Sequence, residues 1–278
     1  MIKDTIKLIR PLNVAITILA VYAGCIIAGP EFISWKIIWA AISAGLIAAY
    51  GNMVNDIFDL ALDRMAKLSR PLPAGTISVR MAWIVALWMA GVGLILAALI
   101  NPMCLAIAFL ICLLLYLYTP YLKGFGFWGN VVVALIGGLS FVYAAAAVGN
   151  MARGLIPGVF AFLFHLIREI IKDIEDMRSD REFGVRTGAV IYGGNISRMA
   201  AMAAALILII LTIGPFIYGQ YGRLYLAIIL IAIDIPVVYF MAMLMKSSDV
   251  ITCGRISGYM KAIMPLGIIA LFLGSRGF

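Results

Sequence analysis

The sequence contains few charged residues. They make up 12% of its 278 residues, whereas 65% are hydrophobic and the mean hydropathy is +1.10. A soluble domain of this length does not need so much apolar surface, because its exterior must be largely polar. The composition therefore excludes a soluble protein and predicts an integral membrane protein.

Cysteine and histidine are also scarce, with four cysteines and a single histidine. Cys25, Cys104 and Cys112 lie in apolar runs, and no C-x-x-C pair occurs. We therefore expect small buried residues rather than disulfides or metal ligands. The lone His165 lies in an apolar segment and is expected to be a hydrogen-bonded packing residue.

Apolar segments of spanning length recur along the chain, separated by breaks that carry Gly, Pro and Asn. The briefest break is Asn101-Pro102, which leaves almost no loop between two segments. The candidate spans cover approximately residues 11–29, 33–55, 80–100, 102–119, 128–149, 154–172, 195–218, 223–245 and 257–275. The sequence thus predicts nine transmembrane helices in a multi-pass protein of the cell membrane.

The distribution of basic residues predicts the orientation of these spans. The net charge is +8, and most Lys and Arg residues fall in alternate connections if the N-terminus is cytoplasmic. Positive charge in a membrane protein usually marks cytoplasmic loops, so we do not read it as a nucleic-acid signature. An odd number of spans then leaves the C-terminus outside.

An acidic pattern, D-x-x-D-x-x-x-D, occurs twice, each time where an apolar segment meets a basic one. Steps of three and four place side chains on one face of a helix, where neighbouring carboxylates repel by roughly a few kcal/mol. Such rows of oxygen ligands suit Mg²⁺, which binds a few carboxylates together with substrate phosphates. We predict two rows on the cytoplasmic side, facing each other across a central cavity. The first acidic row is Asp56, Asp59 and Asp63, and the second is Asp173, Asp176 and Asp180.

Basic and polar residues are interleaved with both rows, an arrangement that suits a phosphate-bearing ligand. Two candidates have an alternative explanation. Lys123 lies at the end of a span and could extend to the membrane interface, and Tyr118 could belong to an interfacial aromatic belt. The candidate substrate-binding residues are Asn52, Lys67, Arg70, Tyr118, Lys123 and Arg178.

With these residues placed, the chain resembles the UbiA superfamily of intramembrane prenyltransferases. The family pattern N-x-x-x-D-x-x-x-D is matched by Asn55, Asp59 and Asp63, and its second pattern, D-x-x-x-D, by Asp176 and Asp180. The stretches NDIFDLALDRMAKLSRPLPAG and REIIKDIEDMRSDREFGVRT are most similar to those of archaeal digeranylgeranylglyceryl phosphate synthases. The resemblance covers nearly the whole chain.

The resemblance implies an all-α fold, in which nine transmembrane helices form a pseudo-repeat of helix bundles around a central cavity. A single prenyltransferase domain would cover residues 1–278. Segments at about 56–79 and 173–194 would form cytoplasmic caps over the cavity.

The resemblance also implies a Mg²⁺-dependent reaction. A geranylgeranyl group would pass from geranylgeranyl diphosphate to geranylgeranylglyceryl phosphate, forming a membrane ether-lipid precursor. No nucleic acid or obligate protein partner is expected. The implied catalytic residues are Asp59, Asp63, Asp176 and Asp180, which would hold Mg²⁺ together with Asn55, Asp56 and Asp173.

Two other functions are compatible with parts of this pattern. An aromatic acceptor, as in 4-hydroxybenzoate polyprenyltransferases or chlorophyll synthases, would use the same motif core. A secondary transporter could also contain repeats and buried acids, although transporter sites usually lie near the bilayer midplane on broken helices. Here the acids cluster at helix ends, which favours an enzyme.

Overall fold

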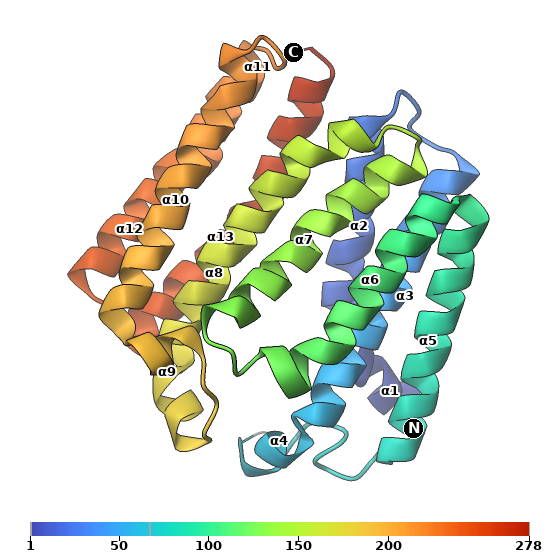
Figure 1. Cartoon of the computed structure of the whole chain (residues 1–278), viewed down its shortest axis with the longest axis vertical. Coiled ribbons are helices and arrows are strands. Elements are labelled where there is room, and N and C mark those ends of the chain that lie inside the picture. The colour runs from blue at the N-terminus through green and yellow to red at the C-terminus, as the bar shows by residue number, and fades with distance from the viewer. Residues whose placement is uncertain (1, 67, 278) are drawn as a thin grey trace. The chain divides into compact units, whose positions relative to one another are not determined.

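The computed structural model describes residues 2–66 and 68–277, and in this part of the chain the regular structure is helical (Figure 1). One isolated bridge, between Gly126 and Thr187, is the sole β-type pairing among these residues. Nine helical segments of the described chain are long and apolar enough to cross a membrane. They cover Pro11–Ala28, Trp35–Phe58, Val79–Ile100, Pro102–Leu122, Phe127–Ala147, Met151–Glu182, Gly194–Ile217, Arg223–Lys246 and Val250–Ser275. The predicted all-α class and number of spans are confirmed.

Two of these spans are longer than the sequence predicted. Helix α8 continues through the second acidic row to Glu182 instead of ending near residue 172. Helix α13 begins at Val250 rather than near residue 257. In both places polar side chains end the apolar run, but helical backbone hydrogen bonds do not require apolar side chains.

The chain divides into two compact units, which are described separately here. The first contains the residues up to Leu122 together with Leu139–Gly154. Its helices are α1 (Ile2–Ile9), α2 (Pro11–Ala28), α3 (Trp35–Phe58), α4 (Leu60–Ala66), α5 (Val79–Ile100), α6 (Pro102–Leu117), the π-helical turn η1 (Tyr118–Leu122), the second part of α7 (Phe127–Ala147) and the short 3₁₀ helix η2 (Met151–Gly154).

The second unit contains Lys123–Gly138 and the chain from Leu155 onward. Its helices are the first part of α7, α8 (Leu155–Glu182), α9 (Gly188–Tyr192), α10 (Gly194–Ile217), α11 (Arg223–Ile229), the π-helical turn η3 (Leu230–Asp234), α12 (Ile235–Lys246) and α13 (Val250–Ser275). The single domain, the central cavity and the facing acidic rows stay predictions.

Polar residues at the breaks define where several helices begin. Ser34 and Ser78 accept hydrogen bonds from the third residue of α3 and α5, respectively. Asn101 ends α5 and also caps α6, because its Oδ1 accepts a hydrogen bond from the Cys104 N–H over 2.8 Å. Pro102 follows at the first position of α6, where a missing N–H costs nothing. These caps explain how two spans can meet without an intervening loop.

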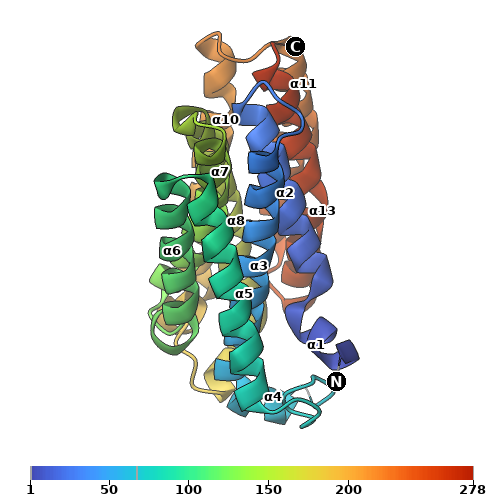
Figure 2. The ribbon, with the colours of Figure 1, turned by 90° about the vertical axis from the view of Figure 1, so that its right-hand side faces the viewer.

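In the first unit, α3 packs against α2, α5 and α6 (Figure 2). The close approach depends on glycines: a Cβ added at Gly45 would lie 2.6 Å from Ile18 of α2, and one at Gly51 would lie 2.8 Å from Leu115 of α6. Small residues at helix contacts are typical of membrane bundles, where close packing rather than water exclusion stabilises association. The Gly51–Leu115 contact brings the end of α3 beside the end of α6.

In the second unit, α8 packs against α10 and α13, with Ile167, Ile171 and Ile256 fully buried. The four cysteines of the chain are buried and unpaired, as predicted. This apolar packing surrounds the part of α8 that precedes the second acidic row, and that row occupies the final turns of the helix.

Candidate active site

The first acidic row spans the junction of α3 and α4 rather than one uninterrupted helix. Helix α3 ends at Phe58, and Asp59 is its C-cap with φ −79° and ψ 2°. The Asp63 N–H donates to the Asp59 carbonyl oxygen over 2.8 Å, so the chain turns immediately into α4. The three carboxylates of this row therefore do not share one set of partners.

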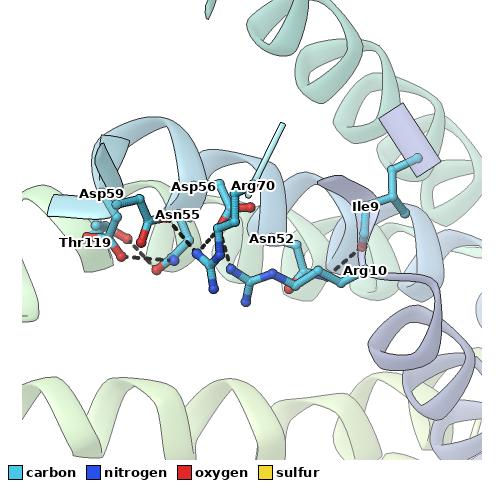
Figure 3. A network of polar contacts seen from close by, with 9 residues as sticks. Ile9, Arg10, Asn52, Asn55, Asp56, Asp59, Arg70 and Thr119 are labelled. Atoms are coloured by element: carbon cyan, nitrogen blue, oxygen red, sulfur yellow. Dashed lines mark hydrogen bonds and ion pairs between the residues drawn. The ribbon is translucent and has the colours of Figure 1, made fainter. Parts of the chain in front are cut away.

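Asp56 and Asp63 are buried and paired with arginines. Figure 3 shows Arg10 and Arg70 beside Asp56. Nη1 of Arg70 donates to Oδ2 of Asp63 over 2.6 Å and to Oδ1 of Asp56 over 3.2 Å. Arg10 donates to the same Oδ1 of Asp56. Two guanidinium groups thus offset the charge of two buried carboxylates. The metal-binding role of Asp56 and Asp63 stays a prediction.

Arg10 reaches Asp56 because of an unusual backbone conformation between α1 and α2. Its φ of 57° and ψ of 71° place it in the left-handed region, and Pro11 begins α2 immediately afterwards. Figure 2 shows α1 turning away from α2 at this point. The predicted substrate-binding residue Asn52 stabilises the turn, since its Nδ2 donates to the Ile9 carbonyl oxygen over 2.9 Å (Figure 3). Arg10 was not identified from the sequence.

Asp59 belongs to a second network, formed with Asn55 and Thr119. Asn55 Nδ2 donates to Asp59 Oδ2 over 3.1 Å, and the Thr119 hydroxyl donates to Asn55 Oδ1 over 3.1 Å (Figure 3). Gly51 and Leu115, which contact each other, each lie one turn before a member of this network. The close approach of α3 and α6 therefore places Thr119 within reach of Asn55. Thr119 was not identified from the sequence.

The second acidic row lies on the last three turns of α8, and each of its three aspartates is partly exposed as a whole residue. The Thr187 hydroxyl donates to Asp180 Oδ2 over 3.2 Å. Lys123 and Lys172 act electrostatically on Asp180. The substrate-binding role of Lys123 stays a prediction. Lys123 and the second acidic row both belong to the second unit.

The buried polar atoms of the second unit that have no hydrogen-bond partner among the described residues include Oδ2 of Asp173 and Nδ2 of Asn130, which lies on α7. Buried polar groups are normally hydrogen-bonded, so each such atom needs an explanation. A buried carboxylate oxygen without a donor is suited to a cation, which fits the predicted Mg²⁺ at Asp173. Asn130 was not identified from the sequence.

The remaining predicted substrate-binding residues lie in different environments. Tyr118 begins the π-helical turn η1 and is partly exposed. The side chain of Arg178 is 88% exposed and pairs with Glu182 over 3.4 Å, one turn further along α8. Such an exposed pair contributes little stability. Lys67 lies outside the described residues.

The ligand chemistry of both rows fits Mg²⁺. Within the part of the chain that the structure describes, no group of three or more His, Cys, Asp or Glu side chains converges as a ready-made metal cage. Mg²⁺ rarely uses such cages, because it retains water and is bound by one or two carboxylates plus substrate phosphates. Asp59 with Asn55, and Asp173 with Asp176 and Asp180, are all oxygen donors of this kind.

Comparison with known proteins finds a matching family model and relatives that cover nearly the whole chain. Residues 17–254 match the model of the UbiA prenyltransferase family. The chain is 36% identical to the digeranylgeranylglyceryl phosphate synthase of Methanopyrus kandleri over 97% of its length and 98% of that protein. It is 34% identical to the synthase of the same name from Saccharolobus solfataricus over its whole length and 98% of that protein.

Solved structures agree with this relationship. A structure described in work on digeranylgeranylglyceryl phosphate synthase in membranes superposes with a TM-score of 0.85 at 32% identity, covering all of this chain and 99% of the other. A UbiA homologue from Archaeoglobus fulgidus, bound to DMAPP and Mg²⁺, superposes with a TM-score of 0.71 at 19% identity, covering 94% of this chain and 99% of the other. At that identity the second likeness shows the fold alone.

Proposed function

Because the chain belongs to the UbiA prenyltransferase family, we propose that it transfers a geranylgeranyl group from geranylgeranyl diphosphate to geranylgeranylglyceryl phosphate. The observation that carries this proposal is the 36% identity to a digeranylgeranylglyceryl phosphate synthase over 97% of the chain. An alignment of this extent includes both acidic rows and the segments between them. The chain is therefore a membrane prenyltransferase, and the acceptor is the specific part of the proposal.

In the proposed reaction the allylic C–O bond between the donor chain and its diphosphate breaks. The acceptor hydroxyl oxygen forms an ether bond to that allylic carbon, its proton passes to a base, and diphosphate leaves. A carboxylate of the acidic rows is the proposed base. The apolar spans supply a site for two long prenyl chains at little cost, since burying them removes apolar surface from water.

We assign the oxygen donors of both rows to the diphosphate end of the donor. The proposed donors are Asn55 and Asp59 of the first acidic row and Asp173, Asp176 and Asp180 of the second. When bound, Mg²⁺ would stabilise the charge that develops on the departing diphosphate. Asp63, which is paired with Arg70, would also contribute carboxylate oxygens to this set of donors.

Arginine and lysine complete the anion site in this proposal. Arg70 already bridges Asp56 and Asp63 through one nitrogen, and a guanidinium group carries five N–H donors, so it can also bind a phosphate. Lys123, which acts electrostatically on Asp180, and Lys67 are proposed to bind the remaining phosphate oxygens. An acceptor that carries a phosphate explains the need for several cations beside the carboxylates.

We propose that the N-terminus and both acidic rows lie on the cytoplasmic side and that the C-terminus lies outside. The support is the concentration of Lys and Arg in the connections on the side of the acidic rows. Reporter fusions at each terminus test this orientation, because a cytoplasmic reporter and an exported reporter differ in activity. If a reporter that functions only in the cytoplasm is active when fused to the C-terminus, the proposed orientation is wrong.

The acceptor is tested by mass spectrometry of lipid products. The purified full chain in lipid nanodiscs receives geranylgeranyl diphosphate and either geranylgeranylglyceryl phosphate or 4-hydroxybenzoate, in the presence of Mg²⁺ or EDTA. We expect the doubly alkylated ether lipid only with the lipid-phosphate acceptor, loss of product with EDTA, and recovery when Mg²⁺ is returned.

Three results would overturn the proposal. A prenylated aromatic product alone would assign the chain to the aromatic-acceptor branch of the family. Product formation that survives thorough chelation would remove Mg²⁺ from the reaction. Absence of any prenylated product, together with solute uptake into proteoliposomes, would favour a transporter.

A further inference from the structure

Thr187 stands at the N-cap position of α9, yet its hydroxyl does not cap that helix. No side-chain hydrogen bond joins Thr187 to the first turn of α9, although threonine at this position usually accepts one. The hydroxyl instead donates to Oδ2 of Asp180 over 3.2 Å, and the residue is buried. Its hydrogen-bonding capacity is thus directed at the last carboxylate of the second acidic row.

The backbone between Asp180 and Thr187 is also fixed. The Val185 N–H donates to the Asp180 carbonyl oxygen over 2.8 Å, and the Gly184 N–H donates to the Arg181 carbonyl oxygen. Gly184 has a φ of 72°. This is a Schellman motif, which ends α8 with a glycine in the left-handed conformation. Asp180 is therefore held at its carbonyl group by the helix end and at its carboxylate by Thr187.

A second set of contacts holds the Thr187 segment against the start of α7. The Gly126 N–H donates to the Arg186 carbonyl oxygen over 3.1 Å, and Gly126 forms the isolated parallel bridge with Thr187. The rings of Phe127 and Tyr192 stack, with centroids 5.1 Å apart and an angle of 10° between their planes. These contacts clamp both ends of the segment 187–192.

At Gly188 the packing against Phe127 leaves no space for a side chain. A Cβ added there would lie 2.5 Å from the Phe127 ring, closer than real Cβ contacts. Any side chain at Gly188 must therefore displace the ring or the backbone beside Thr187. Gly194, a few residues further on, has nothing within 4 Å of an added Cβ and is a matched control.

We propose that Thr187 is a positioning residue that fixes the orientation of the Asp180 carboxylate for binding a divalent cation with diphosphate. This inference rests on the proposed function, in which Asp180 is a ligand. The hydroxyl occupies Oδ2 and sets the rotation of the carboxylate, so that Oδ1 has a defined direction. Outer-shell partners of this kind typically change metal affinity or activity by about 10–100-fold when removed.

The test uses Mn²⁺ and inorganic pyrophosphate as probes on the full chain in detergent. Mn²⁺ suits the same oxygen ligands as Mg²⁺, and its bound fraction is measured by electron paramagnetic resonance. We expect Thr187→Val to weaken pyrophosphate-dependent Mn²⁺ binding by about tenfold. Thr187→Ser retains the hydroxyl and should bind nearly as wild type does. Gly188→Ala should weaken binding although the hydroxyl is present, whereas Gly194→Ala should not.

The outcomes separate this inference from the proposed function. If the wild-type chain binds no Mn²⁺ with pyrophosphate, the proposed function fails. If wild type binds and Asp180→Asn does not, but Thr187→Val binds normally, the positioning role is overturned while the function stands. Should Thr187→Val fail to fold, Gly188→Ala decides alone: unchanged binding contradicts the inference, and weakened binding with Gly194→Ala unaffected supports it.

Discussion

Arg70 donates a hydrogen bond from Nη1 to Oδ2 of Asp63 over 2.6 Å. The same nitrogen also contacts Asp56, so one guanidinium group joins two buried carboxylates. Removing one partner of a buried ion pair leaves an uncompensated charge, which costs more than the pair itself contributes. The Arg70 side chain is 31% exposed, so water offsets part of this cost.

Arg70→Met should therefore lower the thermal stability of the protein, and adding Asp56→Asn should restore part of it. The coupling between the two positions, obtained from a double-mutant cycle, is expected at about 0.5–3 kcal/mol. Arg64→Met, on the exposed side of α4, is the control and should leave the melting temperature nearly unchanged. Additive effects of Arg70→Met and Asp56→Asn would show that the two side chains do not act together.

Asp59→Asn and Asp180→Asn should each reduce turnover while the protein remains folded. Both substitutions remove a negative charge from the proposed Mg²⁺–diphosphate site, and each residue has a hydrogen-bond donor beside it in the structure. The loss should reach or exceed the roughly 10–100-fold typical for an outer-shell partner. Product formation is measured by mass spectrometry, with Glu31→Gln at an exposed connection as the control. A near-normal rate in either variant would exclude that residue from the site.

Thr212 and Asp234 form a buried polar pair inside the second unit. The Thr212 hydroxyl lies 3.1 Å from both carboxyl oxygens of Asp234 and 2.8 Å from the Ile209 carbonyl oxygen. The π-helical turn that ends at Asp234 and the following proline explain why α12 needs a polar contact to α10 here. We interpret Asp234 as a structural residue rather than a transport site.

This interpretation predicts different outcomes for two substitutions. Asp234→Asn can donate to the Thr212 oxygen, so the melting temperature should change little. Thr212→Val leaves the carboxyl group without its hydroxyl partner and should cost about 1–3 kcal/mol of stability. Thermal unfolding in detergent measures both. Equal destabilisation by the two variants would refute the structural role, and loss of turnover in Asp234→Asn alone would indicate a chemical one.

Asp249 caps the N-terminus of α13, outside the membrane-spanning segments. Its Oδ1 accepts the Thr252 N–H over 2.7 Å. Hydrogen bonds from the Ser247 hydroxyl and the Thr252 N–H lower the pKa of the Asp249 carboxyl below its usual value. A lowered pKa in the folded state means that the stabilisation is present above the unfolded-state pKa and disappears as the pH falls through the folded-state pKa.

The stability difference between wild type and Asp249→Asn should therefore depend on pH. Asparagine keeps the N-cap but carries no charge, so wild type should be the more stable protein near neutral pH. Below about pH 5 the difference in melting temperature should shrink as the carboxyl is protonated. Thermal unfolding at several pH values measures it, and a difference that is constant with pH would contradict the role of ionised Asp249.

The spans and the breaks between them could be predicted from the sequence because each depends on neighbouring residues. A bilayer requires about 20 consecutive apolar residues in a helix, and this requirement is visible in any single segment. Asn101-Pro102 and the break before α5 likewise act through residues three positions away. The end of α8 and the beginning of α13 were missed because the turns there contain polar residues, and an apolar run does not report where backbone hydrogen bonding starts or stops.

The acidic rows were identified from spacing, but their partners were not. Spacing predicted one stripe for Asp56, Asp59 and Asp63, yet the junction at Asp59 divides them between an arginine network and the Asn55–Thr119 network. Arg10 lies 46 residues from its partner Asp56, and Thr119 lies 64 residues from Asn55. Nothing in the local sequence links such distant residues.

The sequence by itself determined that this protein is a bundle of membrane-spanning helices with two rows of carboxylates at helix ends. Hydropathy and helical periodicity are properties of consecutive residues, so both can be read without knowledge of the fold. Only the tertiary structure decided which donor each carboxylate meets: Arg10 through a left-handed turn, Thr119 through a glycine contact between helices, and Thr187 through the clamp on Phe127. Those pairings depend on packing between segments far apart in the chain, which residue type and spacing do not encode.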